Sequence, residues 1–561
     1  MPLVGRPRGE PARERPRGPA LAHRAGGDVG GRGPDMTRTA GEIGAGLAPA
    51  RTARPIAPGE RIHVVGAAGA GASAAALLAA HGGAAVAGCD AGGPSPYTPA
   101  VEAAGIHLSW THDPAHALTA PRPNRLAVTK ALTAVVADHP ELTAARSLGI
   151  PVESWQQVVA DAAVGRRLVA VAGTHGKSTS AGWLVHLLVT AGADPSAFVG
   201  ALLPPALTGG VAATARIGRG DVFVVEADEY AGNFDPFRPS ITLLTSAEWD
   251  HPDVFADRAT VLTTFESWIR HAAPGPEGGP PVLVANVGDP GVAEIADRFR
   301  DWPGRLLVVA LVAAAPQRLG ELAAGFRDRY RTALGSAQTL IGRITDMSPG
   351  GTTLELHGLD PLAGTLTAVL PTAGRHNAAN ALGVAGVALS LGIQPAAITV
   401  GLASFGGVGR RLERKGEVAG VVVYDDYGHH PTAIRETIAA VRQREPGRRV
   451  WAVYEPLTYH RTASLLHEFA AALATADAVA VADIWAGRDL DTTITSSEVL
   501  ATAVARFRAD IQHAAPGSVE ATADWLAAEV HAGDAVLVMG GGRSYRIGER
   551  LLDRLARMEG G

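Results

Sequence analysis

The sequence contains a single cysteine, Cys89, among its 561 residues. One cysteine excludes a framework of disulfides within the chain, and it excludes a metal cluster held by several thiolates. So little cysteine also fits a protein of a reducing compartment such as the cytosol. We therefore interpret Cys89 as a small apolar residue of the interior.

The sequence also lacks an excess of basic residues, a signal peptide and a membrane span. The formal net charge of -5 gives no overall basic surface, so nucleic acid is not the expected partner. No stretch of about 18 uninterrupted apolar residues occurs, and the N-terminus has no apolar run that could act as a signal peptide. We expect a cytoplasmic monomer or homodimer that acts on small molecules, without a nucleic-acid or membrane partner.

Residues 1–55 have little hydrophobic periodicity and are rich in Arg, Pro, Gly and Ala, as in RPRGEPARERPRGPA. This composition predicts a disordered tail. Met36 opens a more ordinary N-terminus, so translation from Met36 is an alternative to a functional basic tail.

What the sequence does contain predicts several folded α/β domains. Hydrophobic residues make up 47% and charged residues 19% of a chain that is longer than one core usually organises. From Arg61 onward, short β-branched runs alternate with helical stretches rich in Ala and Leu, a pattern typical of βαβ units and mostly parallel sheets. We expect three domains, over residues 56–160, 161–403 and 404–561.

The strongest local pattern is an apolar strand over 168–172 that is followed by GTHGKST and a helical stretch. Glycines bring backbone N–H groups close to a phosphate, a lysine supplies a cation, and a serine hydroxyl can bind Mg²⁺. The sequence therefore predicts an ATP site. Its residues are Gly173, Thr174, His175, Gly176, Lys177, Ser178 and Thr179.

Acidic segments follow the next two apolar runs, EADE at 226–229 and EWDH at 248–251. In open parallel sheets, ligands bind beside the carboxyl ends of the strands, and Mg²⁺ prefers hard oxygen ligands. Taken singly, each segment is more often a solvated loop. Their joint place after the phosphate loop favours a magnesium ion held beside that loop by one carboxylate together with the nucleotide phosphates.

Further polar residues begin predicted helices or follow predicted strands. HNAAN starts one helix at 376–380, where Asn377 is equally plausible as a helix cap, and YDDYGHHP spans 424–431, where one of the two histidines is expected to be structural. Arg410 and Arg411 follow a glycine-rich segment, and an arginine there can pair a carboxylate or a phosphate. The turn Gly66-x-x-Gly69-x-Gly71 is as consistent with close packing as with a diphosphate.

Together these motifs resemble a known family. GTHGKST, VVEADEY, EWDH, GRHNAAN, FGGVGRR and YDDYGHHPT, in this order from Arg61 onward, are similar to the Mur ligases. The resemblance implies a Rossmann-like N-terminal domain, a central P-loop ATPase-like domain and a Rossmann-like C-terminal domain. Within the family, GTHGK with YDDYGHHPT is specific to the branch that adds L-alanine to UDP-N-acetylmuramate for peptidoglycan synthesis, together with its tripeptide-recycling relative.

The resemblance also implies roles for single residues. Lys177 would neutralise phosphates, Ser178 and Glu226 would hold one Mg²⁺, and His251 would hold a second. The remaining implied contacts are His376, Asn377 and Asn380 to adenine, Arg410 to the phosphates, Asp426 to the ribose, Gly66, Gly69, Gly71 and Ser73 to the UDP-sugar, and Tyr427, His429 and Arg461 to the amino acid.

The chain departs from the family pattern in a few places. Ser178 stands for the usual threonine and keeps the hydroxyl, whereas Ser246 stands where an asparagine is usual. Leu457 and Thr458 stand where a histidine and an arginine are usual, which removes an expected partner of the amino-acid carboxylate. The tripeptide-recycling ligase therefore stays the nearest alternative, and a non-ligase P-loop ATPase or an inactive binding module are further ones.

Overall fold

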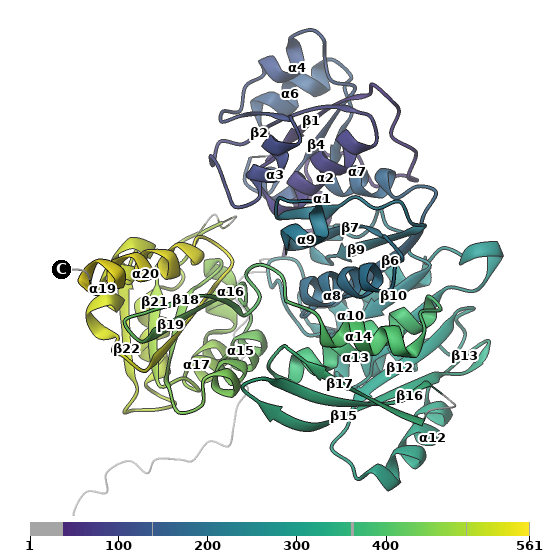
Figure 1. Ribbon diagram of the computed structural model, residues 1–561. Helices are drawn as coiled ribbons and strands as arrows, with labels where there is room; N and C mark the ends of the chain where they lie inside the picture. Colours follow the sequence, from purple (N-terminus) through teal and green to yellow (C-terminus); the bar gives the residue numbers. More distant parts are fainter. Residues whose placement is uncertain (1–36, 137, 361–363, 488, 490, 560–561) are drawn as a thin grey trace, which may run out of the picture. The chain divides into compact units, whose positions relative to one another are not determined.

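The computed structural model describes residues 37–136, 138–360, 364–487, 489 and 491–559 (Figure 1). They contain three large sheets and one short hairpin of β13 (Arg331–Thr332) with β14 (Gly335–Ser336). Most strand pairs in the large sheets are parallel, so the predicted α/β class is confirmed. Each large sheet falls inside one of the three expected domain ranges, and the exact domain boundaries stay predictions. No helix in this part of the chain is long and apolar enough to cross a membrane.

The first sheet is parallel throughout. Its strands, in order across the sheet, are β3 (His107–Ser109), β2 (Ala85–Cys89), β1 (Arg61–Val65), β4 (Arg125–Val128) and β5 (Val152–Ser154). Ile62 and Val64 share one apolar cluster with α2 (Ala70–His81) and α7 (Trp155–Ala162). Val65 joins the cluster of the other face, with α4 (Ala115–Leu118) and α6 (Pro140–Ser147). Two shorter helices are α3 (Thr98–Ala103) and α5 (Lys130–Thr133).

The second sheet has ten strands and carries the phosphate loop at the end of β6. In order across the sheet they are β17 (Gly364–Leu370), β16 (Gly351–Asp360), β15 (Gln338–Ser348), β12 (Arg305–Leu311), β11 (Val282–Asn286), β10 (Ile241–Leu244), β6 (Arg167–Ala172), β9 (Val222–Ala227), β7 (Ser196–Leu203) and β8 (Ala213–Arg216). The Ala- and Leu-rich helices α8 (Lys177–Thr190) and α13 (Arg375–Ser390) are buried in one apolar cluster with α14 (Pro395–Ala403). The other α-helices of this region are α9 (Pro205–Thr208), α10 (Arg258–Arg270), α11 (Pro290–Asp297) and α12 (Leu319–Arg329).

The third sheet has six strands, and only its edge strand β18 is antiparallel to its neighbour. In order they are β18 (Glu413–Val418), β19 (Val421–Asp426), β23 (Asp534–Gly540), β20 (Arg449–Glu455), β21 (Ala478–Ala482) and β22 (Gln512–Gly517). Apolar clusters cover both faces, as continuous runs such as VVVY in β19 require. The helices are α15 (Pro431–Arg444), α16 (Tyr459–Ser464), α17 (Leu466–Leu473), α18 (Ser497–Val504), α19 (Val519–Glu529) and α20 (Tyr545–Glu559).

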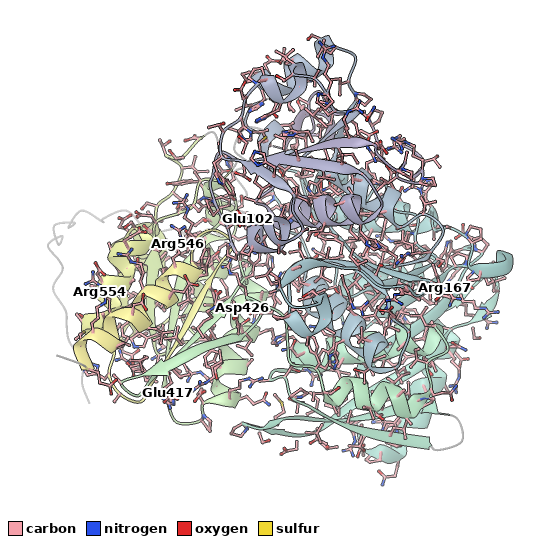
Figure 2. The ribbon with its side chains drawn as sticks, turned by 45° about the horizontal axis from the view of Figure 1, so that its top comes forward. Glu102, Arg167, Glu417, Asp426, Arg546 and Arg554 are labelled. Atoms are coloured by element: carbon pink, nitrogen blue, oxygen red, sulfur yellow. The ribbon has the colours of Figure 1, made fainter. Side chains whose placement is uncertain are left out.

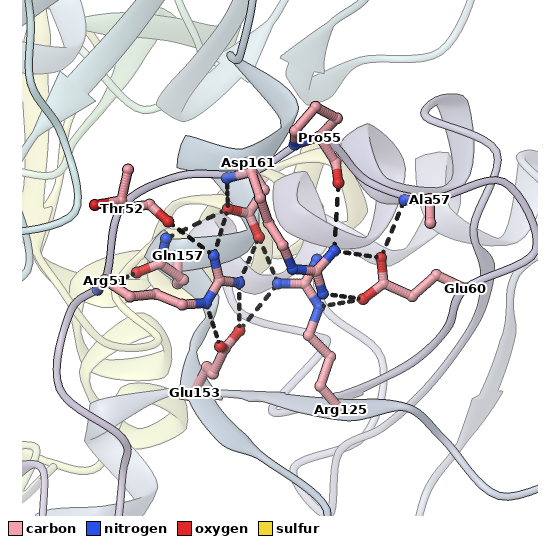
Figure 3. Close-up of polar contacts among 10 residues, drawn as sticks. Arg51, Thr52, Pro55, Ala57, Glu60, Arg125, Glu153, Gln157 and Asp161 are labelled. Carbon is pink, nitrogen blue, oxygen red and sulfur yellow. Dashed lines mark hydrogen bonds and ion pairs between the residues drawn. The ribbon is translucent and has the colours of Figure 1, made fainter.

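The sequence predicted a disordered tail over residues 1–55, and this range is too long. Its residues 1–36 lie outside the described part, but residues 37–55 are ordered and include α1 (Ala40–Ile43). Arg51 pairs with Glu153 and Asp161, both at 2.7 Å (Figure 3). The same two acids pair with Arg125, whose side chain is almost fully buried. Composition alone predicted disorder because the acids that hold Arg51 lie about 100 residues away in the sequence.

Candidate functional site

The phosphate loop connects β6 to α8 and fits only glycine at two places. Gly173 has φ +133°, and a Cβ there would lie 2.3 Å from Thr245 Oγ1. Gly176 has φ +77°, and its Cβ would lie 2.4 Å from Asn380 Oδ1. Both contacts are too short for a side chain. The glycines therefore let the loop lie against the end of β10 and the start of α13.

Hydrogen bonds from the segment after β10 fix the shape of this loop. Ser246 accepts from the Thr174 N–H through its carbonyl at 3.1 Å and from the His175 N–H through Oγ at 2.8 Å. Thr174 Oγ1 donates to the Glu248 carbonyl at 3.1 Å. Ser246 thus holds the loop even though it lacks the amide that the family pattern expects there.

Lys177 is the first residue of α8, and carbonyl and carboxylate oxygen atoms surround its ammonium group. Its Nζ donates to the Gly173 carbonyl at 2.6 Å and pairs with Glu229 at 3.1 Å and with Asp228 at 3.5 Å. Burial alone would lower the pKa of Lys177, but these carboxylates together with Glu226 raise it, so the ammonium stays charged. Burial raises the pKa of Glu229 to about 7, an effect that Lys177 offsets in part. The loop therefore holds a permanent cation beside the N-terminus of a helix.

Ser178 and Glu226 place two hard oxygen atoms side by side. Ser178 Oγ donates to Glu226 Oε1 at 2.8 Å, and the other carboxylate oxygen accepts from the Gly200 N–H at 2.6 Å. Arg411 donates to the same Ser178 hydroxyl at 2.8 Å. A hydroxyl, a carboxylate and a guanidinium thus meet at the start of α8, an arrangement suited to a magnesium nucleotide.

His251 lies in a second cluster, with Asp250 and Arg461. Arg461 approaches Asp250 Oδ1 at 2.8 Å through Nε and His251 Nδ1 at 2.9 Å through a terminal nitrogen. Because a guanidinium only donates, Nδ1 accepts, which leaves Nε2 of His251 as the nitrogen that carries a proton. Burial alone would raise the pKa of Asp250, but Arg461 and His251 bring it well below its usual range. His251 has φ +56°, a backbone strain that this packing maintains.

A cavity of about 380 Å³ lies on one side of the phosphate loop. Of the residues expected to bind the nucleotide, His175, Gly176, Thr179, His376, Asn380 and Asp426 line it. Asp426, at the end of β19 (Figure 2), accepts from the N–H groups of Leu412 and Gly428, both at 2.7 Å. Asn377 is not in the lining, because its amide donates to the Ala373 carbonyl and accepts from Asn380.

A second cavity, of about 370 Å³, lies on the other side of the loop. It is lined by Thr174, Lys177, Ser178, Glu226, His251, Tyr427, His429 and, from helices α2 and α7 beside the first sheet, Gly71 and Trp155. His175, Gly176, Arg411 and Ala433 line both cavities, so the two meet at the phosphate loop. Residues beside all three sheets therefore contribute to one continuous site.

Arg410 lines neither cavity, although the resemblance implied that it contacts the phosphates of ATP. Its Nε pairs with the buried Asp425 at 3.0 Å, and a terminal nitrogen donates to the Gly540 carbonyl and to Ser544 Oγ. Its neighbour Arg411 lines both cavities instead. Nothing in the sequence distinguishes the role of Arg410 from that of the adjacent Arg411. Arg410 has φ +57°, and its N–H donates to Glu413 Oε2 at 2.8 Å.

The N-terminal glycine turn contributes one of its members to the second cavity. Gly71 lines it, and a Cβ there would lie 2.1 Å from the Trp155 ring. Gly66 has φ +85° and Gly69 caps α2, so both shape the turn. Ser73 is fully buried, donates to the Ala70 carbonyl at 2.9 Å and contacts Thr214 Oγ1 at 3.0 Å. The structure therefore does not bring Ser73 to the site.

Two of the three residues expected at the amino-acid site, Tyr427 and His429, line the second cavity. His429 Nδ1 donates to the Tyr427 carbonyl at 2.9 Å, and the ring of Tyr427 lies under the guanidinium of Arg411 at 5.1 Å. Burial, and then the charge of Arg461, brings the pKa of His429 well below its usual range. Leu457 lines the same cavity, whereas Arg461 reaches it only through His251.

Comparison with known proteins agrees with this architecture. A profile described as "Mur ligase family, catalytic domain" matches residues 61–167, and one described as "Mur ligase, glutamate ligase domain" matches residues 410–542. A relative from Frankia casuarinae named UDP-N-acetylmuramate--L-alanine ligase is 36% identical over 88% of this chain and 98% of its own. One of the same name from Kineococcus radiotolerans is 37% identical over 88% of this chain and 96% of its own.

Solved structures share the fold. UDP-N-acetylmuramate-alanine ligase MurC from Thermotoga maritima has a TM-score of 0.67 and 21% identity, with 89% of this chain and 99% of that chain covered. Murein peptide ligase mpl from Psychrobacter arcticus has a TM-score of 0.63 and 23% identity over the same shares of the two chains. At these identities the likeness concerns the fold alone.

Proposed function

The chain belongs to the Mur ligase family, and from this premise we propose that it joins L-alanine to UDP-N-acetylmuramate in an ATP-dependent reaction of peptidoglycan precursor synthesis. The observation that carries the proposal is the pair of cavities that meet at the phosphate loop. The first cavity is lined by the residues that we expect to contact the base and the ribose of ATP. The second is lined by Lys177, Arg411, Glu226 and several histidines, which provide the charged and polar groups for an acyl transfer. Because ATP and a nucleotide sugar are metabolites of the cytoplasm, we place the reaction there.

In this proposal ATP binds with its base and ribose in the first cavity and its phosphates along the start of α8. His376 and Asn380 line the base region, and Asp426 is a carboxylate that can accept from ribose hydroxyls. The N–H groups of the first helical turn, Lys177 and Arg411 then neutralise the phosphates. We assign the phosphate contact to Arg411 rather than to Arg410, because Arg410 is engaged with Asp425.

The residues present also fit magnesium. Ser178 and Glu226 would hold one ion, since a hydroxyl and a carboxylate in contact are the hard ligands that Mg²⁺ binds. His251 would hold a second through a ring nitrogen that carries no proton, which requires the Arg461 contact at Nδ1 to open. Bound Mg²⁺ supplies positive charge to the phosphate oxygens.

The second cavity then holds the acceptor carboxylate and the incoming amine. The lactyl carboxylate of the sugar attacks the γ-phosphorus, ADP leaves, and an acyl phosphate forms. The amine of L-alanine attacks the acyl carbon, the tetrahedral intermediate loses phosphate, and the amine gives up a proton. Catalysis of this kind depends on positioning and charge neutralisation, which Lys177 and Arg411 supply.

We place the sugar on the side of Gly71 and Trp155, and the amino acid on the side of Tyr427, His429 and Leu457. Leu457 adds no charge to this part of the lining, so the carboxylate of L-alanine has Arg411 as its nearest lining arginine in the described structure. Arg461 acts on this site through His251, which it orients.

Phosphate release tests the proposal. With UDP-N-acetylmuramate and ATP, release should depend on L-alanine and should be abolished in Lys177→Ala. Lys415→Ala, which alters a lysine paired with Glu413 and outside both cavities, should behave as the parent. Activity with L-alanyl-γ-D-glutamyl-diaminopimelate and none with L-alanine would assign the chain to tripeptide recycling. Release without any amine would indicate a P-loop ATPase that is not a ligase.

A further inference from the structure

A group of metal-binding side chains lies in the first sheet, away from both cavities. It consists of His63 on β1, Cys89 at the end of β2, His116 on α4 and Glu141 on α6, and we call it the Cys89 cluster. None of these residues lines either cavity of the proposed active site. The reaction proposed above therefore leaves the Cys89 cluster unexplained.

The four side chains direct their ligand atoms at one point. His63 Nε2 and His116 Nδ1 each lie 2.9 Å from Glu141 Oε1. Cys89 Sγ lies 3.3 Å from His63 Nε2 and 3.4 Å from both carboxylate oxygens. All the ligand atoms lie within 4.8 Å of one another. His112 adds a fifth donor, with Nδ1 at 3.3 Å from Cys89 Sγ.

These separations are close to those of a zinc site. Zinc–sulfur bonds of about 2.3 Å and zinc–nitrogen or zinc–oxygen bonds of about 2.0–2.2 Å separate tetrahedral ligand atoms by roughly 3.3–3.7 Å. The 2.9 Å contacts to Glu141 need to widen by only a few tenths of an ångström. Imidazole, thiolate and carboxylate are also the three ligand types that zinc takes in proteins.

The surroundings favour a bound cation. Cys89 and Glu141 are 0% exposed and His63 is 6% exposed, and the neighbouring side chains on this face of the sheet include Val65, Leu126 and Leu142. An ionised carboxylate buried among aliphatic side chains costs several kcal/mol unless an opposite charge accompanies it. A dication bound by one thiolate, one carboxylate and two neutral imidazoles leaves the buried group with no net charge.

From this geometry we propose that His63, Cys89, His116 and Glu141 bind one zinc ion, with His112 as a neighbouring donor. The ion connects two strands to α4 and α6 and so stabilises the N-terminal domain. Binding converts the Cys89 thiol to a thiolate, and its proton passes to solvent.

The site has a consequence for the glycine turn beside it. The Cys89 carbonyl accepts from the N–H groups of Gly66 and Ala67 at 2.8 and 3.1 Å. A metal that fixes the Cys89 side chain also fixes this carbonyl, and with it the start of the turn that leads to Gly71. Zinc thus orders the end of the first sheet that faces the second cavity.

Cobalt spectroscopy on the full-length chain tests the site. Because Cys89 is the only cysteine in the sequence, any thiolate-to-cobalt charge-transfer absorption must come from it. Apo protein titrated with Co²⁺ should develop this absorption to one equivalent, and one equivalent of Zn²⁺ should abolish it. No charge-transfer absorption in the folded wild-type protein would overturn the proposal, and this measurement requires no variant.

Variants then identify the other ligands. Cys89→Ser should lose the absorption, and His116→Ala should weaken Zn²⁺ binding by roughly 100-fold, because altering even an outer-sphere partner of a metal costs about 10- to 100-fold. His107→Ala removes an exposed histidine of β3 in the same sheet and should bind as the wild type. At the same Zn²⁺ concentration, the Tm should rise less in His116→Ala than in the wild type. Equal binding by His107→Ala and His116→Ala would contradict the assignment of His116.

Discussion

Arg411 donates a hydrogen bond to the hydroxyl of Ser178 at 2.8 Å, across 233 positions of the sequence. This bond connects the segment that leads into the third sheet with the first turn of α8. The adjacent Arg410 points to Asp425 at 3.0 Å. The two neighbouring arginines therefore have separate partners, and their replacement should have separate effects.

Arg411→Ala should lower kcat/KM for ATP by about 100-fold and leave the Tm unchanged, because it removes a cation from the phosphate region. Arg410→Ala should instead lower the stability by about 3 kcal/mol, because it leaves the buried Asp425 without its partner. Steady-state kinetics and thermal unfolding of both variants check the pair. Loss of ATP-dependent kinetics in a stable Arg410→Ala, with a normal Arg411→Ala, would reverse our assignment.

Glu226→Gln should raise the Mg²⁺ concentration for half-maximal activity by roughly 10- to 100-fold, because an amide replaces a charged ligand in contact with Ser178. The side chain keeps the shape that accepts from Gly200. Asp221→Asn, on an exposed acid just before β9, is the matched control and should leave the Mg²⁺ dependence as it is. A Glu226→Gln enzyme with the parent's Mg²⁺ dependence would place the ion elsewhere.

His430 should make the protein less stable in acid. It accepts from the Thr432 N–H and contacts the Trp249 carbonyl, so the fold holds a neutral imidazole. Burial, and then His175, lowers its pKa from 6.5 to about 4. The unfolded chain therefore takes up this proton first, and stability is lost as the pH falls from about 6.5 to about 4, by up to about 1.4 kcal/mol per pH unit.

Urea unfolding at pH 7 and pH 5 measures this dependence. His430→Asn keeps a good residue for the start of α15 and has no proton to gain, so its stability should fall less between the two pH values. Equal losses in the variant and the parent would show that other groups bind the proton.

Arg125→Met should destabilise the protein by about 3–5 kcal/mol, because Glu153 and Asp161 lose a buried partner. Arg51 shares these acids, so residues 37–55 should become sensitive to protease in the same variant. Arg122→Met, on an exposed neighbour, is the control for both measurements. Residues 37–55 that stay protected in Arg125→Met would indicate that other contacts order them.

The phosphate loop was predictable because its chemistry is local. Gly173, Gly176, Lys177 and Ser178 lie within six positions of one another where a strand leads into a helix, so their spacing defines their geometry. The same holds for the three α/β blocks, whose strands alternate with helices along the chain. The fold class followed from such short-range patterns, and so did the loop at which we propose that the nucleotide binds.

Other features depend on contacts between distant segments, and the sequence does not encode them in any spacing. Ser73 has the right place in the glycine turn, but Thr214 of another sheet covers it. In the sequence, Cys89 is recognisable only as a small residue of a buried strand. The fold places His63, His116 and Glu141 next to it. Composition alone could not identify either arrangement.

Mass spectrometry of the reaction products tests the central claim most directly. Incubation with UDP-N-acetylmuramate, ATP, Mg²⁺ and L-alanine should convert the nucleotide sugar to a species heavier by one alanine less water, with one phosphate released for each molecule formed. Phosphate release with an unchanged nucleotide sugar would contradict the account.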